Sequence, residues 1–125
     1  MPPKQPFPAA RRIKRNRDFV AIRNTGKPYR CPYFALYALA RTDPIDVGNH
    51  PRIGISASRR VGNAVTRNRL KRRMRELFRR NQCRIRSDCD LLLSIRSPAA
   101  NASFDELEQR FQQAIKYKRL LRQGR

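Results

Sequence analysis

Basic side chains dominate residues 59–80, where ten of the 22 residues are arginine or lysine and Glu76 is the only acid. Guanidinium and ammonium groups donate hydrogen bonds and carry a lasting positive charge, so this set binds anions rather than moving protons. The whole chain shares the bias, with 30 basic and 9 acidic residues and a net charge of +21. A polyanion, and nucleic acid in particular, is therefore the predicted partner.

Arginine outnumbers lysine 24 to 6 in the chain. The planar guanidinium binds phosphate through two hydrogen bonds and stacks on bases, which favours RNA or DNA as the ligand. A GC-rich coding sequence would also raise this ratio, but it would not account for the net charge.

Residues that could support catalysis or bind a metal are sparse. The nine acids are scattered, His50 is the only histidine, and Cys31, Cys83 and Cys89 form no C-x-x-C pair. These patterns argue against a zinc site and a disulfide framework, and indicate three reduced thiols in a cytoplasmic protein. No apolar run approaches the roughly 20 residues that cross a bilayer, so we expect no membrane association.

The length of 125 residues fits one domain. Residues 1–10 contain four prolines and are predicted to be a disordered tail, which leaves residues 11–125 as a single RNA-binding domain. A short helix capped by Asn16, with Phe19 and Ile22 on its apolar side, should end at Gly26.

Three segments have the composition of strands: one from about Tyr33, a second over residues 52–58, and an apolar third over residues 90–96 that should be covered on both faces. Residues 42–51 read as a loop. The basic segment is helical, since Thr66, Arg67, Leu70, Met74, Leu77 and Phe78 recur on one face. A final helix, capped by Asn101 or Ser103, carries an apolar stripe of Phe104, Leu107, Phe111, Ala114 and Ile115. A helix between strands predicts a βαβ unit in an α/β fold, with a crossover that the general rule makes right-handed.

One string in the chain is long enough to be specific. Residues 52–72 follow the pattern R-x-G-x-S-x-S-[KR]-[KR]-x-G-N-A-V-x-R-N-R-x-K-R. Gly62 and Asn63 suit a turn from strand into helix, and the positive end of the helix adds to the charge of Arg67 and Arg69. Such a cluster can hold folded RNA by its phosphates and sugars, with Asn68 free to bond a base or a 2′-hydroxyl.

The run GNAVTRNRLKRRMRELF closely resembles the RNR signature of the protein subunit of bacterial ribonuclease P. RIKRNRDFVAIRNTG resembles that family's N-terminal helix, and DLLLSIRSPA its later strand. The resemblance covers nearly the whole chain after the tail. It implies an α+β sandwich with a small mixed sheet and packed helices, like a ribosomal-protein domain. It also implies a left-handed βαβ crossover through the RNR helix, against the general rule.

The resemblance also implies a function. The RNA subunit of ribonuclease P is the ribozyme that removes the 5′ leader from precursor tRNA, so the protein has no catalytic residue and no metal site. The protein binds that RNA, contacts the leader and strengthens Mg²⁺ binding, with the Mg²⁺ held mainly by the RNA. The implied partners are ribonuclease P RNA and precursor tRNA, and no protein partner is required.

Residue by residue, the resemblance predicts two sets of contacts. Those to the catalytic RNA are Arg59, Arg60, Asn63, Arg67, Asn68, Arg69, Lys71, Arg72 and Arg75, of which Arg59 and Arg60 could instead hold the leader. Those to the leader are Phe19, Arg23 and Tyr37, where Arg23 replaces a frequent aromatic residue of the family. Phe19 could equally be ordinary core, and Lys71, Arg75 and Arg79 could be merely solvated.

Two other functions fit part of the sequence. A protein nuclease would need a general base or clustered carboxylates, which the scattered acids do not supply. A ribosomal protein or an RNA chaperone would share the charge but not the long signature.

Overall fold

The computed structural model describes residues 27–40 and 51–121. The predicted tail, the predicted helix with Phe19 and Arg23, and all of the predicted loop except Pro51 lie outside these ranges.

Four strands form one mixed sheet in the order β1-β2-β4-β3. They are β1 (Tyr29–Arg30), β2 (Phe34–Ala40), β3 (Arg52–Ala57) and β4 (Cys89–Ile95). β2 runs antiparallel to β4 and to β1, whereas β3 runs parallel to β4. The three predicted strands are confirmed as β2, β3 and β4, and each bound that was predicted is matched to within one residue.

The strand β4 lies in the interior of the sheet, between β2 and β3. Leu91, Leu92 and Leu93 are all fully buried, so side chains on both faces of this strand are covered. This confirms the interpretation of the continuous apolar run, because a strand exposed on one face would alternate apolar with polar residues.

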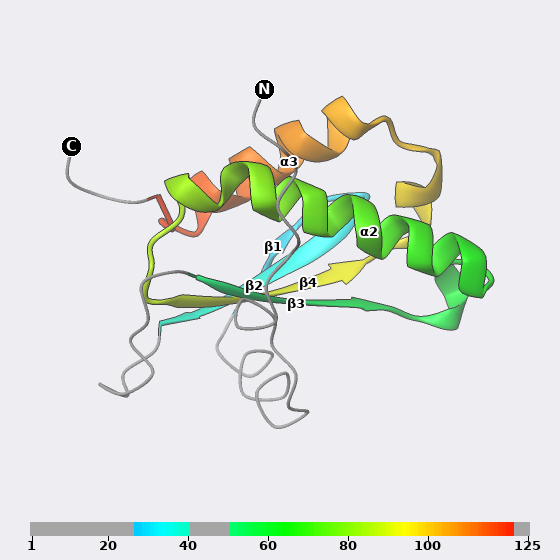
Figure 1. Cartoon of the computed structure of the whole chain (residues 1–125), viewed down its shortest axis with the longest axis horizontal. Helices are drawn as coiled ribbons and strands as arrows, with labels where there is room; N and C mark the ends of the chain where they lie inside the picture. Colours follow the sequence, from blue (N-terminus) through cyan, green and yellow to red (C-terminus); the bar gives the residue numbers. More distant parts are fainter. Residues whose placement is uncertain (1–26, 41–50, 122–125) are drawn as a thin grey trace.

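The helices α2 (Ala64–Asn81) and α3 (Phe104–Tyr117) cover the same face of the sheet, as Figure 1 shows. α2 connects the parallel strands β3 and β4 and so completes the predicted βαβ unit. The described part is a two-layer α/β sandwich, as expected. The left-handed crossover stays a prediction from the family resemblance.

The turn into α2 depends on two residues of the motif. Gly62 has φ of 153°, in the region that favours glycine, and a Cβ added there would lie 3.0 Å from Thr66 Cγ2. Asn63 Oδ1 then accepts a hydrogen bond of 2.9 Å from the Thr66 backbone N–H and caps the helix. A side chain at position 62 would therefore strain the start of α2.

The core lies between the two helices and the sheet. α2 buries Leu70, Met74, Leu77 and Phe78, as the periodicity predicted, while Thr66 and Arg67 on the same face are half-buried. α3 buries the predicted Leu107, Phe111, Ala114 and Ile115. Of the two predicted caps, Ser103 is the one used, in a reciprocal capping box with Glu106.

Short 3₁₀ turns link the main elements: η2 (Arg59–Val61), η3 (Gln82–Arg84) and η4 (Ser97–Asn101). The three cysteines are free thiols, with Cys31 and Cys89 buried and Cys83 exposed. Within residues 27–40 and 51–121, no helix has the length and apolarity to span a bilayer.

Candidate nucleic-acid interface

The first half of α2, residues 64–72, presents the RNR motif to solvent. Asn68, Arg69 and Arg72 are exposed, and Lys71 is half-buried. Arg59 and Arg60, on η2 just before the helix, are exposed as well. The five basic side chains at 59, 60, 69, 71 and 72 have no hydrogen-bond or ion-pair partner among the described residues. Their charges are therefore available to an external anion.

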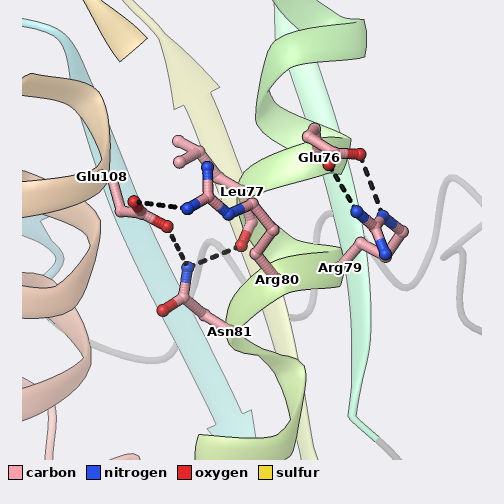
Figure 2. A network of polar contacts seen from close by, with 6 residues as sticks. All are labelled: Glu76, Leu77, Arg79, Arg80, Asn81 and Glu108. Carbon is pink, nitrogen blue, oxygen red and sulfur yellow. Dashed lines mark hydrogen bonds and ion pairs between the residues drawn. The ribbon is translucent and has the colours of Figure 1, made fainter. Parts of the chain in front are cut away.

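The second half of α2, residues 73–81, holds its cations differently. Arg79 donates to both carboxylate oxygens of Glu76, at 2.9 Å from Nε and 2.5 Å from Nη2 (Figure 2). Arg80 lies 3.4 Å from Glu108 on α3 and stacks over the Phe104 ring at 5.1 Å. Arg73 donates to the Ala102 carbonyl at 3.1 Å. These three guanidinium groups are used within the protein.

Asn81 joins the same network from a buried position, with 2% of its surface exposed. Its Nδ2 donates to the Leu77 carbonyl at 2.8 Å and to Glu108 at 3.2 Å, and its Oδ1 accepts from Gln112 (Figure 2 draws the first two bonds). Asn81 thereby fastens the end of α2 to α3. The sequence analysis did not predict this role.

Asn63 has a structural role beside its predicted RNA contact. Its Oδ1 is occupied by the cap to Thr66, although the residue is exposed. The uncapped backbone N–H groups of the first turn give this end of α2 a partial positive charge. The motif therefore joins side-chain cations to a helix end that itself attracts phosphate.

Besides Lys71, two more of the predicted RNA contacts are half-buried: Arg67 near the start of α2 and Arg75 further along it. The Nε of Arg67 is covered and finds no hydrogen-bond acceptor among the described residues. Because buried donors usually have an acceptor, this nitrogen could be satisfied by a partner outside the described residues. The place of Arg67 in the motif is not explained by packing alone.

A further cation lies near η2, at the end of the sheet where β3 and β4 stop. β3 and β4 are parallel and Ala57 pairs with Ile95, so Arg59 and Arg96 both follow the carboxyl ends of these strands. Arg96 is exposed, and Ser97 Oγ donates to the Arg60 carbonyl at 3.0 Å, joining η4 to η2. Sequence reasoning missed Arg96, although its position as the last residue of a predicted strand was a usable signal.

Tyr37 lies on the opposite face of the sheet from α2 and α3. It is half-buried and packs, with Leu39, against the fully buried Leu92. On this face Arg52 also makes a two-bond ion pair with the buried Asp90, at 2.9 and 2.6 Å. The structure thus separates Tyr37 from the RNR cations and gives the first arginine of the motif a structural partner.

Most described carboxylates are engaged by the chain itself. Arg79, Arg80, Arg86 and Arg52 pair with Glu76, Glu108, Asp88 and Asp90. The hydrogen bond from Arg86 lowers the pKa of Asp88, and the Tyr33 hydroxyl, followed by the Ser103 cap, lowers the pKa of Glu106. No three His, Cys, Asp or Glu side chains gather as a metal site within the described ranges.

Comparisons with known proteins agree with this geometry. The sequence pattern of the family described as Ribonuclease P matches residues 7–122. The chain is 37% identical over 112 residues to the "Ribonuclease P protein component" of Listeria monocytogenes, covering 90% of this chain and 91% of the relative.

Two solved structures from Staphylococcus aureus are similar in fold. The RNase P protein at 2.0 Å has a TM-score of 0.75 and 29% identity, with 90% of this chain and 98% of that one covered. A second structure, described as a mutant with defective mRNA degradation activity, has a TM-score of 0.75, 30% identity and coverage of 89% and 90%.

Proposed function

The chain belongs to the ribonuclease P protein family, and we propose that it binds the catalytic RNA of that enzyme through η2 and α2, mainly the first half of α2. The family supplies the protein component of the ribonucleoprotein endoribonuclease that processes tRNA. The proposed RNA contacts are those predicted from the sequence, joined by Arg96. The observation that carries the proposal is the group of basic side chains that lack a partner among the described residues.

RNA is a fitting ligand for this group because arginines spread over several turns match a phosphate backbone rather than a single phosphate. Each phosphate that an arginine neutralises releases a counterion, so affinity should fall steeply with salt. Asn68, exposed between Arg67 and Arg69, offers both a donor and an acceptor to a 2′-hydroxyl or a base edge.

We assign bond breaking to the RNA rather than to this chain. The described carboxylates are mostly tied to arginines, and this set suits neither a general base nor a protein-held Mg²⁺ site. We propose that Mg²⁺ is held mainly by the RNA. The protein would lower the Mg²⁺ requirement by neutralising phosphates and ordering the complex, working with tRNA in the cytoplasm and needing no other protein.

The proposed leader contact uses Tyr37, with Phe19 and Arg23 from outside the described ranges. Tyr37 and Leu39 form an apolar surface over Leu92 on the sheet face away from the helices. A base stacked on an aromatic ring gains about 1–3 kcal/mol whatever its identity, which suits a subunit that meets many leader sequences. Tyr37→Ala should weaken binding of precursor tRNA more than of mature tRNA. Equal losses for the two would remove Tyr37 from the leader site.

Reconstitution tests the function directly. At low Mg²⁺, cleavage of precursor tRNA at the end of its leader should require both this protein and a ribonuclease P RNA. The protein without RNA should cleave nothing, and the RNA without protein should regain activity only when Mg²⁺ is raised. A protein that leaves the RNA unaffected would contradict the proposal and favour a general RNA chaperone.

RNA cleavage by the protein alone is the main alternative. The description of the Staphylococcus aureus mutant links that relative to mRNA degradation. The described part of this chain offers no assembled catalytic group for such a reaction, so we do not propose it. The protein-only arm of the reconstitution, run with an unstructured mRNA fragment, would detect it.

A further inference from the structure

A hollow of about 520 Å³ lies at the β1 edge of the sheet and is lined by Lys27, Pro28, Tyr29, Arg30 and Tyr117. We call this set the edge pocket. β1 and β3 are the two outer strands of the sheet; α3 packs against β1, whereas α2 packs against β3. The edge pocket and the RNR motif are therefore separate surfaces, and the proposed function uses none of the residues of the pocket.

The most unusual member of the edge pocket is Tyr117. It is the last residue of α3 and leaves 66% of its surface exposed, although an aromatic ring gains most from burial. Its ring meets that of Tyr29 edge-on, with 5.6 Å between centroids and 60° between planes. Tyr29 in turn contacts the fully buried Phe34 at 6.3 Å. The core thus supports a ring that is presented to solvent.

Polar contacts hold this arrangement in place. The Tyr29 hydroxyl donates to Gln113 at 3.3 Å, and Lys118 Nζ donates to the Lys27 carbonyl at 2.7 Å. Arg119 takes φ of 57°, which lets the Leu120 N–H reach the Ile115 carbonyl at 2.8 Å and closes the helix end. A pocket with these supports is formed before a ligand arrives, which lowers the cost of ordering it on binding.

The charge around the edge pocket has one sign. Residues 27–31 and 113–121 contain Lys27, Arg30, Lys116, Lys118 and Arg119 and no acid. An exposed aromatic side chain surrounded by cations is typical of sites for single-stranded nucleic acid. The aromatic ring stacks on a base, and the cations hold the phosphates. Paired bases in a helix could not present a free face to Tyr117.

We propose that the edge pocket binds an unpaired nucleotide of the catalytic RNA, with its base stacked on Tyr117 and its phosphates held by Lys27 and Arg30. Tyr29 pairs with Leu36, so it faces the helix layer, whereas Tyr37 faces the other side of the sheet. A strand in this pocket is therefore not the leader in its proposed site. The proposal rests on the chain being part of the ribonucleoprotein, and it adds a second anchor for the same RNA.

Substitutions at position 117 test the stacking. Tyr117→Ala should raise the Kd for the catalytic RNA by about 5- to 150-fold, the equivalent of about 1–3 kcal/mol. Tyr117→Phe should keep the affinity, because the ring face remains. Leu121→Ala, which trims an exposed apolar residue at the same end of the chain, is the matched control. Unchanged affinity for Tyr117→Ala, or an equal loss for all three variants, would overturn the proposal.

A fluorescence experiment reports on the pocket itself. The chain has no tryptophan, so Tyr117→Trp introduces a single reporter. The catalytic RNA should quench its emission, whereas inorganic polyphosphate, which has the charge but no bases, should not. Equal quenching by both, or none by the RNA, would refute base stacking at this position.

A third set of measurements distinguishes failure of this inference from failure of the proposed function. Tyr117→Ala should leave the preference for precursor over mature tRNA unchanged; a selective loss of precursor binding would assign the nucleotide to the substrate and overturn the inference. If arginine substitutions on α2 leave RNA affinity intact while Tyr117→Trp is still quenched, the proposed α2 interface fails and the edge pocket stands. If the arginine substitutions weaken RNA binding and the Tyr117→Trp emission is not quenched, only the edge-pocket proposal fails.

Discussion

Residues 64–72 and residues 73–81 of α2 each carry four basic side chains. In the first half, Arg69, Lys71 and Arg72 have no partner among the described residues. In the second half, Arg73, Arg79 and Arg80 bond to the Ala102 carbonyl, Glu76 and Glu108. The two halves therefore differ in what neutralises them, although their compositions are alike.

Two glutamates account for the pairing of Arg79 and Arg80. Glu76 lies three residues before Arg79 on the helix, and Glu108 reaches across from α3 to Arg80 and Asn81 (Figure 2). Ion pairs near the protein surface add little stability, about 0–1 kcal/mol, but each one occupies a guanidinium that RNA could otherwise bind. Charge density along a sequence thus overstates the surface offered to a polyanion.

The largest expected effect comes from the first half. Arg69→Ala combined with Arg72→Ala should raise the Kd for the catalytic RNA about 30-fold, at about 1 kcal/mol for each arginine. The slope of log K against log salt should fall by almost one for each phosphate that is no longer neutralised. Filter binding over a series of salt concentrations measures both.

Arg79→Ala combined with Arg80→Ala is the matched control, since it removes the same charge from the second half. Its effect on RNA affinity should be clearly smaller. Equal losses for the two double variants would erase the distinction between the halves.

A substitution at Asn81 should affect stability instead. Asn81→Ala removes three hydrogen bonds at a buried position and leaves Glu108 and Gln112 with fewer partners. The free energy of unfolding should fall by about 2 kcal/mol, measured by urea denaturation. Gln112→Ala, at a half-buried partner, should cost less. The salt slope of RNA binding for the folded Asn81→Ala protein should match that of the wild type; a changed slope would place Asn81 in the interface.

Removing the acid beside Arg79 should let the second half of α2 bind RNA more as the first half does. Glu76→Gln removes the carboxylate that engages Arg79 and should increase the salt slope of RNA binding by about one, with affinity rising a few-fold. Asp105→Asn changes the net charge equally at an exposed position on α3 and serves as the control. If both variants behave alike, net charge rather than release of Arg79 explains the gain.

The smallest effect concerns the support of α3, which carries Glu108. The Tyr33 hydroxyl at 2.7 Å and the Ser103 cap lower the pKa of Glu106 below its ordinary 4.5. A carboxyl whose pKa is lower in the folded state stabilises the fold above the unfolded pKa, and this contribution is lost as pH falls through the folded pKa. Stability should therefore decline below pH 4.5.

Urea titrations at a series of pH values give the free energy of unfolding as a function of pH. At acid pH this free energy should fall less steeply in Glu106→Gln than in the wild type. Tyr33→Phe should have a smaller effect of the same kind, since the Ser103 cap remains. An unaltered fall at acid pH in Glu106→Gln would assign the pH dependence to other carboxyls, such as Asp88 beside Arg86.

The helices and strands could be located from patterns of neighbouring residues in the sequence. Alternating or continuous apolar residues located the strands, the spacing of Leu70, Met74 and Leu77 located α2, and the long motif around Arg67 identified the family. Each of these signals depends on residues close together in the chain, where periodicity directly reflects which face is buried.

Only the tertiary structure shows which distant parts of the chain contact one another. The order β1-β2-β4-β3, the bond of Arg80 to Glu108, the position of Arg96 beside η2, and the meeting of Tyr29 with Tyr117 join residues far apart in sequence. Such contacts depend on how the helices and strands pack, and packing is set by the shape of the whole core rather than by any local pattern. The sequence by itself predicted a basic RNA-binding helix in which Glu76 lies close to Arg79. Only the folded structure brings Glu108 of α3 to Arg80 and the Ala102 carbonyl to Arg73, because these partners lie far from α2 in the sequence.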